Sequence, residues 1–256
     1  MFKSVDEIKT KLHKYLFPVE ERKVYFQDAD GNPMYSKEYK SIVRADNGKL
    51  ISIMNDTYRI KTNYDVIMPV MEDLHNLDTN WKLDPSHSFI KDNRMRLQVT
   101  FPDLMFNDGG SDVAMSLFLH NSYDGSEGVR MFWGAIRGVC SNGMVFGKIM
   151  AKFYARHTKT ITEKVEGLQT LISETYKFIP VIKERVEILK NLQVGDLVEK
   201  SVKKEFGVKA YDYVKAHKAI NNQYALMNVL TYYISHVVQM HMRANYQMRV
   251  SKLFDL

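Results

Sequence analysis

Cysteine is nearly absent from this chain, because Cys140 is the single one among 256 residues. An internal disulfide is therefore impossible, and a zinc site built from several cysteines is excluded. The sequence also has no run of 18 uninterrupted apolar residues, so we expect no membrane span. Its first residues include acids and lack the apolar stretch of a secretory signal. These absences predict a protein of a reducing cytoplasm.

The sequence motifs of common enzyme classes are also lacking. There is no phosphate-cradling Walker loop, no Rossmann glycine pattern, no nucleophile elbow and no His-Glu-x-x-His zinc motif. Cys140 as a nucleophile with His120 as its base stays open, although lone cysteines between apolar residues are usually core residues. A magnesium site formed by Asp108, Asp112 and Asp124 also stays open, although acids beside glycines are usually turn formers. The sequence favours a protein that has no catalytic residues, metal or other cofactor.

Charge of one sign is missing from two neighbouring stretches. Residues 102–128 contain five acids and no lysine or arginine, whereas residues 129–162 contain six bases and no acid. A basic stretch without local counter-ions presents a positive field that suits phosphate groups. The alternative is a solvated basic face whose acids lie elsewhere in the fold. The six bases are Arg130, Arg137, Lys148, Lys152, Arg156 and Lys159.

The first 160 residues alternate between helical and strand patterns. Ser4 and Glu7 form a capping box for a helix over residues 5–16, and residues 63–77 have helical spacing. Asn47-Gly48 favours the tight turn of a hairpin over residues 41–54. Further strand patterns predict a strand–turn–strand unit at 89–101 and a hairpin with arms at 113–119 and 129–135.

The last third of the chain has helical patterns almost throughout. Apolar residues recur with heptad spacing over residues 161–189, which predicts one kinked helix or two collinear ones around Pro180. A shorter helix is expected at 198–206, closed by Gly207, and a last helix has a seam from Leu226 to Ala244. The fold class is therefore α+β: an antiparallel sheet built from hairpins, with a largely helical C-terminal third packed on it. We expect a sheet region at 1–160 and a helical region at 161–256, joined in one continuous globular unit.

The longest hairpin holds the most specific group of polar residues. Its loop and the end of its second arm contain Asn121, Tyr123, Asp124, Ser126, Arg137 and Asn142. Arg137 alternates onto the face that also contains Trp133, which is unusual for a simple core. Arg137 therefore either pairs with a carboxylate inside the fold or points into a groove where a phosphate or a base binds.

The same hairpin resembles the signature of a known family. The segment NSYDGSEGVRMFWGAIRGVCSNGM looks like Asn-Ser-x-Asp-Gly-Ser followed by Arg-x-Val-Cys-Ser-Asn-Gly, the signature of a phage- and plasmid-borne family of uncharacterised proteins. Weaker similarities extend over roughly residues 25–238. The resemblance implies a mobile-element origin and an intracellular setting, in the cytoplasm of the bacterial host. The loop positions of interest are Asn121, Ser122, Tyr123, Asp124, Gly125, Ser126 and Asn142.

These observations predict a nucleic-acid-binding protein of phage DNA recombination or replication, acting by single-stranded DNA binding or annealing. Cations track phosphates while bases stack on aromatic rings, and here Trp133 lies among the six bases of the basic stretch. We also expect a homo-oligomer, because annealing proteins commonly form rings or filaments. The alternative is a counter-defence or host-interaction protein that acts by binding another protein. An enzyme that acts on nucleic acid through the Asp124 loop is the third interpretation.

Overall fold

The computed structural model describes residues 4–76, 80–84, 88–107, 112–137, 142–145, 153–166, 179–217 and 219–256. The chain divides into two compact units. Unit 1 comprises Met1–Val99, Phe118–Met131 and Phe153–Glu174. Unit 2 comprises Thr100–Leu117, Phe132–Lys152 and Thr175–Leu256. Both units contain segments from either side of residue 160, where the sequence predicts a boundary.

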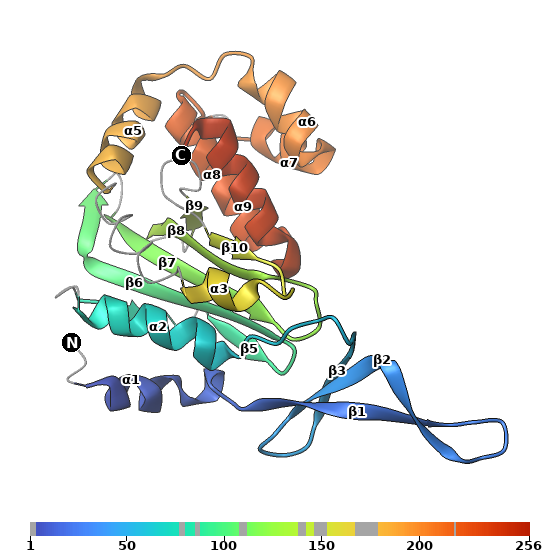
Figure 1. The fold of residues 1–256 in the computed structure, drawn as a ribbon. Helices are drawn as coiled ribbons and strands as arrows, with labels where there is room; N and C mark the ends of the chain where they lie inside the picture. The colour runs from blue at the N-terminus through green and yellow to red at the C-terminus, as the bar shows by residue number, and fades with distance from the viewer. Residues whose placement is uncertain are drawn as a thin grey trace. The chain divides into compact units, whose positions relative to one another are not determined.

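Two sheets form the β structure (Figure 1). The first has the strand order β1-β2-β3, and the second has the order β10-β8-β7-β6-β4, with β5 also paired to β6 and β9 to β8. Pairing is antiparallel between β1 and β2, β2 and β3, β5 and β6, and between β8 and both β9 and β10. With its helices concentrated towards the C-terminus, the chain confirms the predicted α+β class.

Unit 1 contains the N-terminal elements and parts of the second sheet. Ser4 caps its first helix by accepting a hydrogen bond from the Glu7 amide at 3.3 Å, as the sequence predicts. The elements are α1 Val5–Leu12, the 3₁₀ helix η1 His13–Tyr15, β1 Val19–Gln27, β2 Pro33–Arg44, β3 Leu50–Asn55, α2 Asn63–Asn76, β4 Lys82–Leu83, β5 Phe89–Lys91, β10 Phe153–Ala155 and α3 Ile161–Glu166. The strands β6 Arg94–Asn107, β7 Asp112–Ser122 and β8 Val129–Arg137 have residues in both units.

The predicted hairpin around Asn47-Gly48 is confirmed as β2 and β3. Gly48 has φ 71°, which an L residue rarely adopts, so glycine suits this turn. The sequence pattern misses β1, the partner on the other side of β2. Most of β1 is exposed on both faces, and an exposed strand has no alternation of apolar and polar residues by which to recognise it.

Unit 2 contains the C-terminal helices and a small part of the second sheet. Its core includes Trp133, whose ring lies 5.2 Å from that of Phe101, and α8 and α9 both contact β9. The elements are β9 Asn142–Val145, α5 Ile179–Asn191, the π-helix η3 Leu197–Val202, α6 Lys203–Phe206, α7 Val208–Lys215, α8 Gln223–His236 and α9 Met240–Phe254. Gly207 ends α6 with φ 85°, in agreement with its predicted role.

The predicted last helix is wrong in one respect, because the chain leaves the helix after His236. Gln239 has the extended angles φ −57° and ψ 138°, and Arg243 donates to the Val238 carbonyl at 2.8 Å, which satisfies a backbone acceptor at the break. Val237, expected on the buried seam, is 56% exposed within the chain. The heptad stretch appears as α3 and α5, and the predicted continuity between them lies outside the described residues.

Candidate functional site

We call residues 121–126 the signature loop; it begins with the last two residues of β7 and leads towards β8, and its first three residues are buried. The Ser122 hydroxyl donates to the Glu127 carbonyl at 2.7 Å and accepts from the Glu127 amide at 3.0 Å, which closes the loop on itself. Tyr58 donates its hydroxyl to the Ser122 carbonyl at 2.9 Å. Ser122 is therefore a structural residue, because its polar groups hold the loop closed.

Asn121 and Tyr123 attach this loop to the start of α2. The Asn121 side-chain amide donates to the Lys61 carbonyl and to Asn63 Oδ1, both at 2.9 Å. The Asn63 backbone amide donates to the Tyr123 hydroxyl at 2.7 Å. Burial raises the pKa of Tyr123, so its phenol stays protonated. The first free amide of α2 is thus satisfied by a tyrosine from a distant loop.

Asp124 connects the loop to the turn between β5 and β6. Its carboxylate accepts from the Asn93 side chain at 2.6 Å and from the Ser126 amide at 3.0 Å. Burial by itself raises the pKa of Asp124, but the hydrogen bonds from Ser126 and Asn93 outweigh it and hold this pKa below its usual range. Gly125 has φ 70°, so a side chain there would be strained. The predicted turn-forming role of Asp124 agrees with these contacts.

A cluster of ionisable side chains lies buried beside the loop. Arg96 forms an ion pair with Glu127, and His120 Nδ1 lies 3.6 Å from the other Glu127 oxygen. All three residues are at most 9% exposed. Burial lowers the pKa of His120 well below 6.5, and the positive charges of Arg96 and Arg130 lower it further. His120 is therefore neutral in the folded chain at neutral pH.

The buried histidines predict a pH-dependent stability. Burial lowers the pKa of both His120 and His157, so the unfolded chain takes up protons below about pH 6.5 that the folded chain does not. The stability that these two neutral histidines contribute is thus fully present above that pH and is lost as the pH falls. We expect His120→Gln to make the slope of unfolding free energy against pH shallower by about 1.4 kcal/mol per unit between pH 6 and 5. Urea unfolding at several pH values measures the slope, with the exposed His13→Gln as the control; equal slopes in all three proteins would contradict the expectation.

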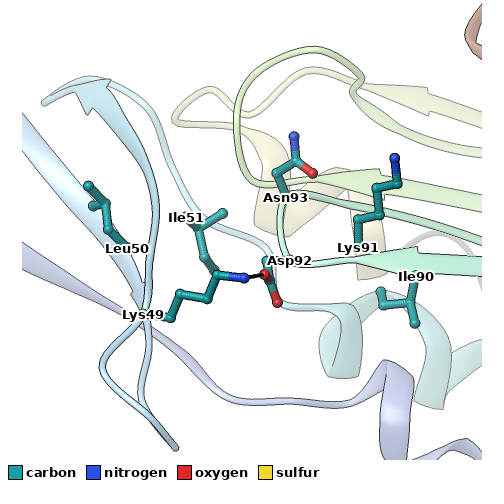
Figure 2. Close-up of a pocket in the computed structure, with 7 residues that line it drawn as sticks. All are labelled: Lys49, Leu50, Ile51, Ile90, Lys91, Asp92 and Asn93. Carbon is teal, nitrogen blue, oxygen red and sulfur yellow. Dashed lines mark hydrogen bonds and ion pairs between the residues drawn. The ribbon is translucent and has the colours of Figure 1, made fainter.

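The turn between β5 and β6 also forms one wall of an open groove. Asp92 accepts from Arg44 at 3.1 Å and forms an ion pair with Lys49, so this turn is tied to the β2–β3 hairpin (Figure 2). Figure 2 shows the two walls, one from the start of β3 and one from β5 and the turn after it. We call this feature the groove; it has a volume of about 510 Å³ and is lined by Lys49, Leu50, Ile51, Ile90, Lys91, Asp92 and Asn93.

An aromatic ring and several cations lie together on β8, β10 and the segment that follows. Tyr154 of β10 pairs in register with Arg130 of β8, and the Arg130 guanidinium lies 5.3 Å from the centre of the Tyr154 ring. Tyr154 is 51% exposed, and Arg156 and Lys159 are exposed as well. A Cβ atom on Gly128 would lie 2.4 Å from the Ala155 carbonyl oxygen, so glycine lets β10 approach this closely. We call Arg130, Tyr154, Arg156 and Lys159 the Tyr154 platform.

Most of the residues described above lie within the part of the chain that matches a known family. The profile of a domain of unknown function, DUF932, matches residues 51–252. The chain belongs to the DUF932 family. The matched range includes the signature loop, the Tyr154 platform and the groove residues from Ile51 onwards, whereas β1, β2 and the groove residues Lys49 and Leu50 precede it. No curated protein and no solved structure matches the chain.

The structure corrects one of the nucleic-acid contacts predicted within the DUF932 range. Trp133 has no exposed surface, because its ring packs in the core of unit 2 against Phe101, and it therefore has no face on which a base could stack. Arg137 pairs with Asn142 between β8 and β9, but the side chains of both lie outside the described part. Lys148, Lys152 and Cys140 also lie outside it. The roles predicted for Arg137, Asn142, Cys140, Lys148 and Lys152 therefore stay predictions.

Two residues that support the candidate site, Arg96 and Asn63, are not indicated as such by the sequence patterns. The alternation of β6 places Arg96 on the polar side of its strand, yet both faces of the strand are buried there and Arg96 pairs with Glu127. The partners lie 31 residues apart, so no local pattern connects them. The sequence does contain one signal for Asn63, because Thr62 and Asp65 cap α2 reciprocally and mark its first turn.

Two absences apply to the described part of the DUF932 chain. Within it, no group of three or more His, Cys, Asp and Glu side chains is arranged to hold a metal ion. Among the same residues, none of the helices has the length and apolar character needed to cross a membrane.

Proposed function

We propose that this protein binds single-stranded nucleic acid through the Tyr154 platform, without catalysis, in the DNA recombination or replication of a phage or plasmid. The observation that supports the proposal most is a half-exposed aromatic ring in register with an arginine, followed by two exposed cations. Proteins that bind single strands use this combination, because bases stack on aromatic rings while cations attract the phosphates.

The geometry of β8 and β10 favours such a contact. Cross-strand partners project from the same face of a sheet, so Arg130 and Tyr154 are side by side and the guanidinium covers part of the ring. Arg156 and Lys159 follow within five residues of Tyr154 along the chain, and both are exposed. The ring would stack with an unpaired base, since paired bases in a duplex already stack on their neighbours.

The proposed setting is a mobile element inside the cytoplasm of a bacterial host. It rests on the resemblance of the loop at residues 121–126 to the phage- and plasmid-borne signature. The loop residues themselves hold the fold, since Ser122, Asp124 and Ser126 are engaged in hydrogen bonds within unit 1. The proposal therefore assigns the contact with nucleic acid to the platform and the loop to its support.

Replacing Tyr154 by alanine tests the proposal. A lost base stack is worth about 1–3 kcal/mol, so Tyr154→Ala should weaken binding to a single-stranded oligo(dT) roughly 5- to 150-fold. Fluorescence anisotropy with a labelled oligonucleotide measures the affinity, and circular dichroism checks the fold. The matched control is Tyr64→Ala on α2, which removes a ring that is 45% exposed and lies outside the platform.

The proposal also predicts weaker binding to a blunt DNA duplex of equal length, because its bases are not available for stacking. Equal affinities of the parent and Tyr154→Ala for oligo(dT) would contradict the platform. A parent protein that binds neither form of DNA at low salt would contradict the function.

A further inference from the structure

The hairpin of β1 and β2 extends beyond β3 as a two-stranded arm (Figure 1). β3 pairs with β2 only from Tyr39 to Val43, whereas the pairing of β1 with β2 continues to Gln27 and Pro33. We call residues 25–35 the arm tip. An isolated pair of strands is only marginally stable in water, and three or more strands or a packed partner are usually needed. A partner packed against the arm tip would therefore stabilise it.

Large apolar side chains cover both faces of the arm tip. Tyr25 pairs in register with Tyr35 on one face, and Phe26 pairs with Met34 on the other. All four are between 45% and 66% exposed. Aromatic residues and methionine are enriched in protein interfaces, and a cluster of them on a projecting hairpin is unusual for a surface that meets only water.

The charge of the arm tip favours a basic protein surface over nucleic acid. Residues 25–35 contain Asp28 and Asp30 and no lysine or arginine. Two carboxylates would repel a phosphate backbone, whereas they would be attracted by a groove that combines apolar walls with lysines. The groove in unit 1 has apolar side chains from Leu50, Ile51 and Ile90, and its two lysines are Lys49 and Lys91. Lys49 is already paired with Asp92, which also lines the groove, so the exposed Lys91 is the lysine that would attract a carboxylate from the tip.

The arm tip and the groove of one chain cannot meet each other. The tip is at the beginning of β2, at Pro33, and the groove lies beside its end, just after the turn that follows Arg44. At about 3.3 Å per residue, and with a bulge on the way, the two ends of β2 are roughly 30 Å apart. A continuous strand keeps them apart, so the arm tip of one chain does not reach the groove of the same chain.

We propose that the arm tip of one copy of this chain inserts into the groove of a second copy. Phe26 and Met34 would contact Leu50, Ile51 and Ile90, and a carboxylate of the tip, Asp28 or Asp30, would approach Lys91. Because the two surfaces differ, the contact is head-to-tail and continues from copy to copy as a row or a closed ring. An insertion of this size is smaller than a standard interface, so the assembly depends on concentration. The inference is independent of nucleic-acid binding.

Sedimentation velocity of nucleic-acid-free protein over a range of concentrations tests this inference. The parent should form species larger than a monomer as its concentration rises. The tip variant Phe26→Glu/Met34→Glu and the groove variant Leu50→Glu/Lys91→Glu should each weaken self-association at least about tenfold, because each introduces charge into an apolar contact. Ile53→Glu is the matched control; this residue is 54% exposed on β3 but does not line the groove, and its variant should assemble like the parent.

Mixing the two defective variants gives the sharpest result. The tip variant keeps an intact groove and the groove variant keeps an intact tip, so the mixture should form a one-to-one dimer and nothing larger. Formation of that dimer also proves that both variants are folded. A parent that stays monomeric at every concentration, a tip variant that assembles like the parent, or a mixture that stays monomeric would each overturn the inference.

Discussion

Glu127→Ala should lower the free energy of unfolding by about 3–5 kcal/mol, the usual cost of removing one partner from a buried ion pair. Glu127 is 9% exposed and pairs with Arg96, which is 7% exposed, so the arginine cannot exchange its lost partner for bulk water. Glu127 also closes the signature loop through its backbone, which alanine retains. The loss of unfolding free energy in this variant therefore comes from removing the Glu127 carboxylate.

Chemical denaturation of the parent and the variant measures this cost as a shift of the transition midpoint. The matched control is Glu163→Ala on α3, which removes an exposed carboxylate and should change stability by less than about 0.5 kcal/mol. If both variants were as stable as the parent, the buried pair would not support the loop as we describe.

Trp133→Ala is expected to have an effect of similar size, about 3–5 kcal/mol, for a different reason. Its ring is fully buried and packs against Phe101, so truncation leaves a large cavity in the core of unit 2. Trp133→Phe fills much of that volume and should retain most of the stability and all of the affinity for oligo(dT). Thermal unfolding measures the contribution of Trp133 to the core, and anisotropy with oligo(dT) measures any contribution to DNA binding. Parent-like stability with lost DNA binding in Trp133→Ala would restore the tryptophan as a nucleic-acid contact.

Local signals in the sequence predict much of the sheet. Asn47-Gly48 and the alternation along β7 and β8 indicate their hairpins, because turn geometry and a buried face each leave a pattern within a few residues. The β1 arm has no buried face and so leaves no such pattern. The break between α8 and α9 is also missed, since the apolar spacing continues through Val237 although the backbone does not.

The candidate site is only partly predictable for a related reason. The polar residues of the signature loop could equally serve a ligand or the fold, and the sequence does not say which backbone groups face them. Asn121 and Tyr123 turn out to satisfy the start of α2, about 60 residues earlier in the chain. The basic stretch identifies Arg130, Arg156 and Lys159, whereas the choice between Trp133 and Tyr154 depends on which ring the fold buries.

The salt dependence of binding to single-stranded DNA tests the central claim most directly. For the parent, log affinity for oligo(dT) should fall linearly with log salt, because each phosphate contact releases condensed counter-ions. Arg156→Ala/Lys159→Ala should flatten that line by about 1.4, roughly 0.7 for each lost contact with a single strand. The exposed pair Lys37→Ala/Lys82→Ala, outside the platform, should leave the slope unchanged. A slope that is the same in the parent and in Arg156→Ala/Lys159→Ala, or a parent whose binding does not depend on salt, would contradict nucleic-acid binding at the Tyr154 platform.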